Sequence, residues 1–179
     1  MTPFVKFREA RDPGDIVQIA GLADIIWREH YTPIIGKAQV DYMLEHFQSA
    51  EAISKQIAEG MVYYLMLKED GAVGYLAIQK RGQELFLSKI YLLREYRGLG
   101  MGKAALDFIA EKARELGCTC IALTVNKNND RSIKAYSKMG FENKGALVTE
   151  IGGGFVMDDY LMVKFLKDMP SGVTGSSQA

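Results

Sequence analysis

The segment Arg97-Gly98-Leu99-Gly100-Met101-Gly102-Lys103 could do chemistry, because it places glycines on alternate residues between a strand-like apolar run and a helix-like pattern. The start of a helix leaves amide protons without partners and carries the positive end of the helix dipole, so it suits phosphate oxygens. Glycine permits close approach because it has no Cβ. The segment therefore predicts a site for a phosphate-bearing ligand.

Two phosphate-binding patterns fit this segment badly. A Walker-type loop, Gly-x-x-x-x-Gly-Lys-Ser/Thr, would need a glycine at Arg97 and a hydroxyl at Ala104. The dinucleotide pattern is met loosely by Gly100-x-Gly102-x-x-Ala105, but the next apolar run ends in Val125-Asn126, without a carboxylate for a ribose. Both patterns are disfavoured, and a glycine-rich turn that merely ends a strand is the structural alternative.

A third pattern, Arg/Gln-x-x-Gly-x-Gly/Ala after a strand, is met in full by Arg97-x-x-Gly100-x-Gly102. It resembles the acetyl-CoA pyrophosphate loop of the GCN5-related N-acetyltransferases (GNAT). Downstream, "VNKNNDRSIKAYSKMGF" is similar to the second signature of that family, Asn-x-x-Ala-x-x-x-Tyr-x-x-x-Gly-Phe, with Ser132 in place of the usual alanine. The resemblance covers roughly residues 60 to 166 and implies an acetyl-CoA-dependent transferase that needs no covalent enzyme intermediate.

The resemblance also implies roles for particular residues. The strand with Ile90, Tyr91 and Leu92 would splay from the strand containing Val125, and its backbone groups would bind pantetheine. Backbone amides of the loop would hold the pyrophosphate, at Arg97, Gly98, Leu99, Gly100, Met101, Gly102 and Lys103. Asn129 would bond the pantetheine arm, although an ordinary helix N-cap is a rival role that could coexist with it.

Acetyl transfer to an amine needs a neutral nucleophile and a proton for the departing thiolate. The resemblance makes the Tyr136 hydroxyl the general acid; its alternative is a core aromatic on one helix face with Ile133. Some relatives place a basic glutamate where this chain has Thr124. The base could then be a water chain or one of several residues, each of which could equally be solvated or salt-bridged: Glu84, Glu150, Asp158, Asp159 and His30.

The acceptor site is expected to involve Asp158, Asp159 and His30. In the strand-like segment "EIGGGFVMDDYLMVKF", Asp158 and Tyr160 share one face and Asp159 lies on the other. Adjacent acids in an apolar strand are unfavourable unless something neutralises them. Together with "KIYLLREYRGLGMGK" and the region from "HYTPIIG" to "DYMLEHF", the segment resembles bacterial spermidine/spermine acetyltransferases, which implies a polyamine acceptor. A structural acid pair, another acceptor such as an antibiotic or a protein N-terminus, and a non-catalytic acyl-CoA-binding module stay open.

Composition narrows the class of protein. The 179 residues are 48% hydrophobic, and 22 Lys plus Arg balance 22 Asp plus Glu, so neither nucleic acid nor an anionic membrane is an expected partner. Two cysteines, Cys118 and Cys120, are expected as buried thiols, and together with His30 and His46 they are too few for a metal site. With no signal or membrane-spanning pattern, we expect a cytoplasmic protein; a homodimer is possible.

The elements that must position these residues follow from periodicity and capping signals. We expect one domain over residues 1–167, a disordered tail over 168–179, and an α/β (α+β) fold of the GNAT type: a mixed, largely antiparallel twisted sheet with helices on both faces and a V-shaped splay between its two central strands. Strands are expected at 3–9, 61–68, 72–80, 84–93, 118–125, 141–150 and 154–166. Helices are expected from 13 to about 29, from 50 to near 60, after the glycine loop with Leu106, Ile109, Ala113 and Leu116 on its buried face, and from 130 to 139. Residues 30–49 are expected to form a loop with short helical turns.

Overall fold

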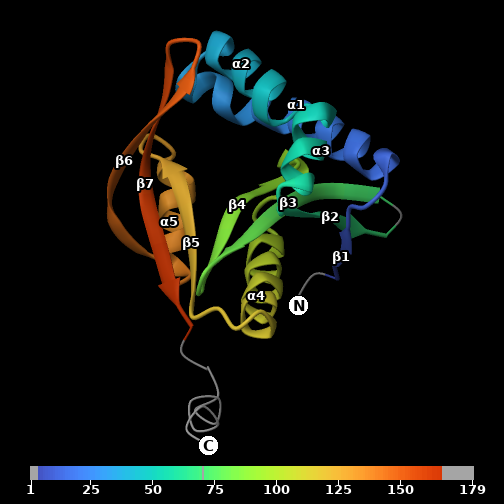
Figure 1. Ribbon diagram of the computed structural model, residues 1–179, viewed down its shortest axis with the longest axis vertical. Helices are drawn as coiled ribbons and strands as arrows, with labels where there is room; N and C mark the ends of the chain where they lie inside the picture. Colours follow the sequence, from blue (N-terminus) through green and yellow to red (C-terminus); the bar gives the residue numbers. More distant parts are fainter. Residues whose placement is uncertain (1–3, 70, 167–179) are drawn as a thin grey trace, which may run out of the picture.

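The computed structural model describes residues 4–69 and 71–166, so the tail over 168–179 lies outside the described residues. Within them, seven strands form one sheet in the order β1-β2-β3-β4-β5-β7-β6 (Figure 1). In chain order the elements are β1 (Lys6–Glu9), α1 (Pro13–Ile35), α2 (Lys37–Phe47), α3 (Ala50–Ala58), β2 (Val62–Lys68), β3 (Gly71–Arg81), β4 (Glu84–Leu92), the 3₁₀ turn η1 (Arg94–Tyr96), α4 (Met101–Glu115), β5 (Cys120–Asn126), α5 (Asp130–Lys138), β6 (Glu142–Gly152) and β7 (Phe155–Phe165).

The sheet is antiparallel at every junction except the central one, where β4 and β5 run parallel through the α4 crossover. That central pairing spans only three residue pairs, from Glu84↔Cys120 to Phe86↔Ala122. Beyond Phe86 the two strands diverge, and Figure 1 shows the resulting V between them. The expected mixed sheet with a splay at its centre is confirmed.

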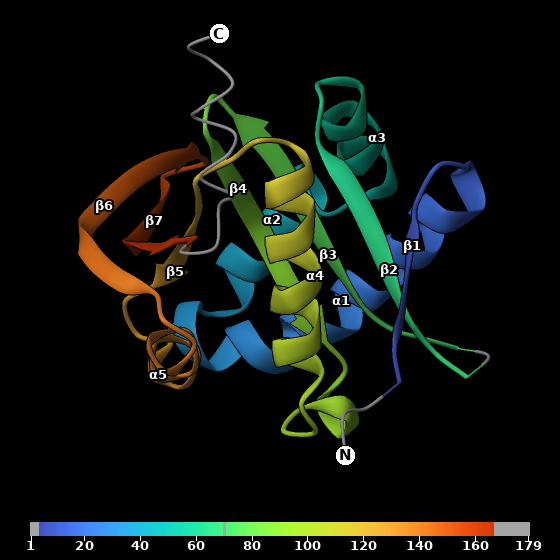
Figure 2. The same cartoon turned by 90° about the horizontal axis from the view of Figure 1, so that it is seen from below.

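Helices cover both faces of the sheet, as expected (Figures 1 and 2). Alternation along β3 shows how one strand serves both cores: Leu76 and Ile78 pack in the cluster under α4, whereas Tyr75 and Ala77 pack in the cluster under α1, α2 and α3. Side chains of α5 join the α4 cluster at its edge. The helices therefore pack on both faces of a sheet whose two central strands, β4 and β5, diverge.

The expectation of a loop over residues 30–49 is wrong. Helix α1 continues to Ile35 with Pro33 inside it, Gly36 turns the chain at a φ of 89°, and α2 starts at once. A proline removes only one backbone hydrogen bond, and here it falls in the last turn. Burial at helical spacing outweighs that loss, because Trp27 and Val40 reach into the core below the two helices.

Helix ends largely follow the capping signals. Asp12 Oδ1 accepts from the Asp15 amide at 2.9 Å and Ser49 Oγ from the Ala52 amide at 3.2 Å. The prediction that Leu116 lies on the buried face of α4 is wrong. Leu116 is 42% exposed, because α4 already ends at this residue. Cys118 is buried and lies before β5, whereas Cys120 is half-buried within it; both thiols are free.

The tip of the β6–β7 hairpin contacts α2, at the open end of the V between β4 and β5 (Figure 1). Tyr42 donates from its hydroxyl to the Ile151 carbonyl at 2.8 Å, and Gln39 donates from Nε2 to the Val156 carbonyl at 2.8 Å. These contacts close one end of the opening between β4 and β5.

Candidate active site

The divergence of β4 from β5 leaves two adjoining cavities, and Tyr91 of β4 lines both of them. The smaller cavity has a volume of about 200 Å³ and is lined by Ile26, His30, Ile90, Tyr91, Leu92, Arg97, Gly102, Arg131, Ser132, Ala135, Tyr136 and Met139. The larger has a volume of about 360 Å³ and is lined by Trp27, Tyr31, Ile35, Gln39, Met43, Phe47, Gln48, Gln56, Met61, Ser88, Tyr91, Thr124, Asn126, Thr149, Ile151, Met157 and Asp159.

The smaller cavity unites both sequence signatures. Ile90, Tyr91 and Leu92 come from β4 past Phe86, the last residue of that strand that pairs with β5. The edge of β4 that faces β5 is therefore unpaired there and can offer backbone hydrogen bonds to a ligand. Tyr136 enters the same cavity from α5.

The glycine loop presents bare backbone beside open space. Gly98 and Gly100 have φ values of 74° and 86°, which favour glycine, and no side chain caps the start of α4. A Cβ placed on Gly98 or on Gly102 would meet nothing within 4 Å. The uncapped amides and the free room above them fit a diphosphate.

Positive charge gathers around this loop. Arg97 donates from Nε to the Leu92 carbonyl at 3.0 Å, which fixes its side chain across the loop. Burial and the nearby Arg131 and Arg94 lower the pKa of Arg97, opposed by Glu29. Guanidinium groups that crowd together in this way gain when phosphate oxygens are placed between them.

The other loop residues contribute no side chain to either cavity. Leu99 is 51% exposed, Met101 is buried in the core under α4, and Lys103 forms an ion pair with Asp107 at 3.0 Å. Within the cavities, these residues can therefore offer only backbone amides to a ligand.

Tyr136 is partly exposed to the smaller cavity and packs edge-on against Phe141, with ring centroids 5.5 Å apart. Burial raises the pKa of its phenol well above the ordinary value, so the hydroxyl stays protonated at neutral pH. It can therefore act as a proton donor.

Asn129 is buried, and its side chain caps α5 by accepting from the Ser132 amide at 3.4 Å. The N-cap role is thus present, and Asn129 lines neither cavity. Its side chain also lies close enough to His30 and Tyr31 of α1 to influence the pKa of each. His30 lines the smaller cavity rather than the larger one, and burial together with the charges of Arg97 and Arg131 lowers its pKa.

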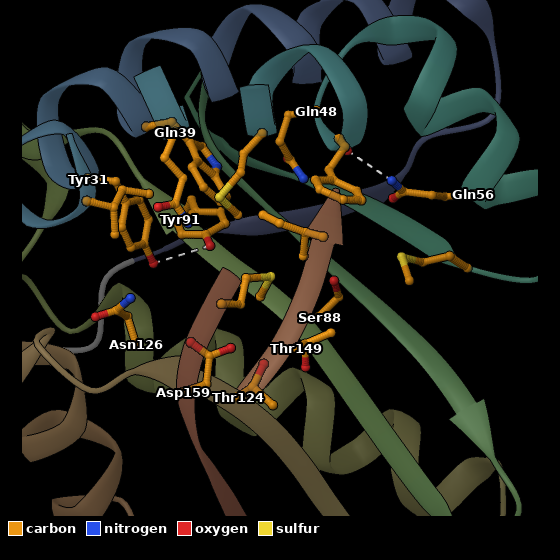
Figure 3. Close-up of a pocket in the computed structure, with 17 residues that line it drawn as sticks. Tyr31, Gln39, Gln48, Gln56, Ser88, Tyr91, Thr124, Asn126, Thr149 and Asp159 are labelled. Carbon is orange, nitrogen blue, oxygen red and sulfur yellow. Dashed lines mark hydrogen bonds between the residues drawn. The ribbon is translucent and has the colours of Figure 1, made fainter. Parts of the chain in front are cut away.

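The larger cavity holds Asp159 on its wall. This residue is 5% exposed, and no hydrogen bond or ion pair to its carboxyl is found among the described residues. Burial, followed by the charge of Asp158, raises the pKa of Asp159 to about 6. Figure 3 shows Asp159 and Thr124 pointing into the cavity from β7 and β5, with Tyr31 and Tyr91 on the opposite wall. The position that carries a glutamate in some relatives is thus a neutral threonine near this carboxylate.

The two adjacent acids are separated by the sheet, as their alternation predicts. Asp158 points to the other face, where it forms an ion pair with Lys127 Nζ at 2.8 Å. Glu84 and Glu150 line neither cavity. Of the candidate bases, only Asp159 and His30 therefore face the opening of the V.

Among the cavity-lining residues that the sequence interpretation did not identify are Arg131, Tyr31 and Ser88. Arg131 lies two residues after Asn129, inside the second signature, so its position was visible but its charge was not used. Tyr31 was not identified because its segment was predicted to be a loop, whereas it lies in α1 and lines the larger cavity. Ser88, opposite Thr124 on β4, carries no sequence signal.

Two features are absent from the described residues, a metal-binding cluster and a membrane-spanning helix. No group of three or more His, Cys, Asp or Glu side chains is placed to hold a metal ion. None of the helices in this part of the chain has the length and hydropathy to cross a membrane.

Comparison with known proteins agrees with this geometry. A sequence model described as "Acetyltransferase (GNAT) family" matches residues 19–141. An uncharacterized N-acetyltransferase of Mycobacterium tuberculosis is 26% identical over 136 residues, which covers 75% of this chain and 86% of the relative. A thialysine N-epsilon-acetyltransferase of Bos taurus is 33% identical over 63 residues, 35% of this chain and 37% of that protein. The crystal structure of PaiA N-acetyltransferase from Thermoplasma acidophilum in complex with coenzyme A superposes with a TM-score of 0.76 at 18% identity, over 91% of this chain and 99% of that one, which shows a common fold.

Proposed function

The chain belongs to the acetyltransferase (GNAT) family and is an acetyl-CoA-dependent N-acetyltransferase, and from that premise we propose which residues perform the transfer and what they acetylate. The acceptor is a primary amine that enters the larger cavity, while the acetyl end of the co-substrate arrives through the smaller one. The observation that carries this proposal is that the two cavities meet at Tyr91, with Tyr136 in the smaller and Asp159 in the larger.

The co-substrate is held mainly by backbone. Amides of residues 97–103 bind its diphosphate at the uncapped start of α4, and the side chains of Arg97 and Arg131 flank it. Backbone groups of Ile90, Tyr91 and Leu92 hold the pantetheine arm along the unpaired edge of β4. Asn129 shapes this end of the site from its position as the cap of α5, next to His30.

When bound, acetyl-CoA supplies an acetyl thioester as the electrophile. The amine nitrogen must lose a proton to attack the carbonyl carbon, and the Asp159 carboxylate, ionised above pH of about 6, is placed to accept it. As the N–C bond forms and the C–S bond breaks, the Tyr136 hydroxyl donates a proton toward sulfur. The products are an N-acetylated amine and free coenzyme A, and solvent returns both side chains to their starting protonation states.

Polyamines such as spermidine and spermine are a second candidate class of acceptor, because one of their ammonium groups could pair with the buried carboxylate of Asp159. The acid pair that suggested them is divided, however, because Asp158 is ion-paired with Lys127 on the other face. A relative named thialysine N-epsilon-acetyltransferase also supports an amine acceptor in general.

The test is thiol release from acetyl-CoA across a panel of amines, for the wild type beside Tyr136→Phe. We expect kcat to fall by about 100-fold or more, the usual contribution of a general acid, while KM for acetyl-CoA changes little. Tyr160→Phe is the matched control, because Tyr160 lines neither cavity and packs beside Lys127. Acetyl-CoA binding without thiol release from any amine would instead indicate a non-catalytic acyl-CoA-binding module.

A further inference from the structure

The described residues give the larger cavity a single negative charge. Among its lining side chains that the structure describes, Asp159 alone is ionisable near neutral pH. A buried carboxylate without an ion pair is unfavourable unless a cation meets it. The neighbouring Asp158 is satisfied by Lys127, so Asp159 is the group in this strand that still needs a partner.

The rest of the wall suits an apolar body. Aromatic rings face the cavity from α1, α2 and β4 at Trp27, Phe47 and Tyr91, and flexible apolar side chains face it from α2 and β7 at Met43 and Met157. Rings of this kind bury large areas and also favour a cation near their faces. A volume of about 360 Å³ is at the small end of the range for ligand pockets, roughly 300–1,000 Å³.

The polar groups at the far end are already used within the protein. Gln48 accepts from the Tyr75 hydroxyl at 2.8 Å, Gln56 donates to the Phe47 carbonyl at 2.9 Å, and Gln39 donates to the Val156 carbonyl at 2.8 Å. These contacts hold α2 and α3 over the sheet. No second carboxylate among the described lining residues would neutralise a second ammonium group.

From this arrangement we infer that the acceptor is a hydrophobic monoamine, whose ammonium group pairs with Asp159 and whose apolar body lies among the aromatic and methionine side chains. A polyamine that entered the cavity fully would bury one or more further ammonium groups without partners, so a monoamine is favoured over it. The inference rests on the proposed function and adds the chemical class of the acceptor to it.

The first experiment compares 2-phenylethylamine and hexylamine with 1,4-diaminobutane and spermidine in thiol release from acetyl-CoA. We expect kcat/KM at least 10-fold higher for the monoamines. Asp159→Asn should lower kcat, because it removes the proposed base, and should also raise KM for 2-phenylethylamine by about 10- to 100-fold, in line with the loss of a charge-assisted hydrogen bond. Asp158→Asn is the matched control, because it removes the adjacent carboxylate outside the cavity, and it should change KM by less than about twofold.

A gain-of-function variant tests the missing second charge. Met157 lines the cavity two residues before Asp159 on the same strand face, so Met157→Glu places a second carboxylate about 7 Å away. We expect its kcat/KM for 1,4-diaminobutane to exceed that of Met157→Gln by about 10-fold. Thermal unfolding of both variants checks that each is folded.

Amine binding to the coenzyme A-saturated protein, measured by titration calorimetry, distinguishes failure of the proposed acetyl transfer from failure of the proposed monoamine acceptor class. If 2-phenylethylamine binds in an Asp159-dependent way but is not acetylated, the acceptor class stands and the proposed transfer fails. If spermidine or 1,4-diaminobutane is the better substrate, the transfer stands and the monoamine inference is wrong. If no amine binds and none is acetylated, both are wrong.

Discussion

Gly74 is the position where a single added methyl group should displace β4, the strand proposed to bind the pantetheine arm of the co-substrate. It lies on β3 opposite Leu92, and a Cβ there would come within 2.3 Å of the Tyr91 carbonyl oxygen and 2.9 Å of Leu92 Cδ2. Atoms in contact normally stay about 3.5 Å apart, so β4 would have to move by roughly 1 Å. The obstructing oxygen belongs to the backbone and cannot rotate away as the end of a side chain could.

Gly74→Ala is therefore expected to lower the free energy of unfolding by about 1 to 3 kcal/mol, the usual effect of overpacking. At about 2–4 °C per kcal/mol for a chain of this size, Tm falls by roughly 2–12 °C. Because the displaced residues Tyr91 and Leu92 line the smaller cavity, KM for acetyl-CoA should also rise, by about 10-fold. Thermal unfolding by circular dichroism and thiol release against acetyl-CoA concentration measure the two effects.

Gly21→Ala is the control for this prediction. Gly21 is exposed in α1, a Cβ there would meet nothing within 4 Å, and alanine should stabilise the helix by about 0.5 to 1 kcal/mol without changing KM. If Gly74→Ala unfolds at the wild-type temperature and binds acetyl-CoA normally, the packing of β3 against β4 does not set the position of β4 at the co-substrate site.

Three further changes test other parts of the molecule. Asp159→Asn should raise the free energy of unfolding at pH 7 by about 1 to 2 kcal/mol, because it removes the cost of burying a charge, a cost that water reaching the cavity already reduces. The folded-state pKa of about 6 lies above the ordinary 3.8, so the native state binds more protons between these values and the wild type loses stability as pH rises through that window; urea unfolding of the variant should lack this slope. Arg131→Gln should weaken coenzyme A binding by about 5-fold at low salt and by less at high salt, since the phosphate charges are screened there; a salt-independent loss would count against a phosphate contact. Tyr42→Phe removes the hydrogen bond to the Ile151 carbonyl and should destabilise the protein by about 0.5 to 1.5 kcal/mol, with an unchanged urea midpoint as the contrary result.

Much of the fold could be predicted because its signals are local. Caps at Asp12 and Ser49 mark helix starts where the structure has them, and Gly117 ends a helix with a φ of 73°. The strands after residue 60 follow period-2 patterns that each hold within a few residues. The prediction of a loop over residues 30–49 failed because Pro33 and Gly36 are local helix-breaking signals. The burial that keeps α1 helical comes instead from contacts with a sheet that is distant in sequence.

Spacing along the chain was enough to predict which residues form the co-substrate side of the candidate site. Arg97, Gly100, Gly102 and Tyr136 are recognisable from spacing alone, because a loop and the helix that follows it keep their geometry wherever they are placed. The tertiary structure alone decided the acceptor side. Alternation places Asp158 and Asp159 on opposite faces, but only the pairing of β7 with β5, and the parting of β4 from β5, decide which face opens into a cavity. That decision depends on contacts between segments more than thirty residues apart, which no local pattern encodes.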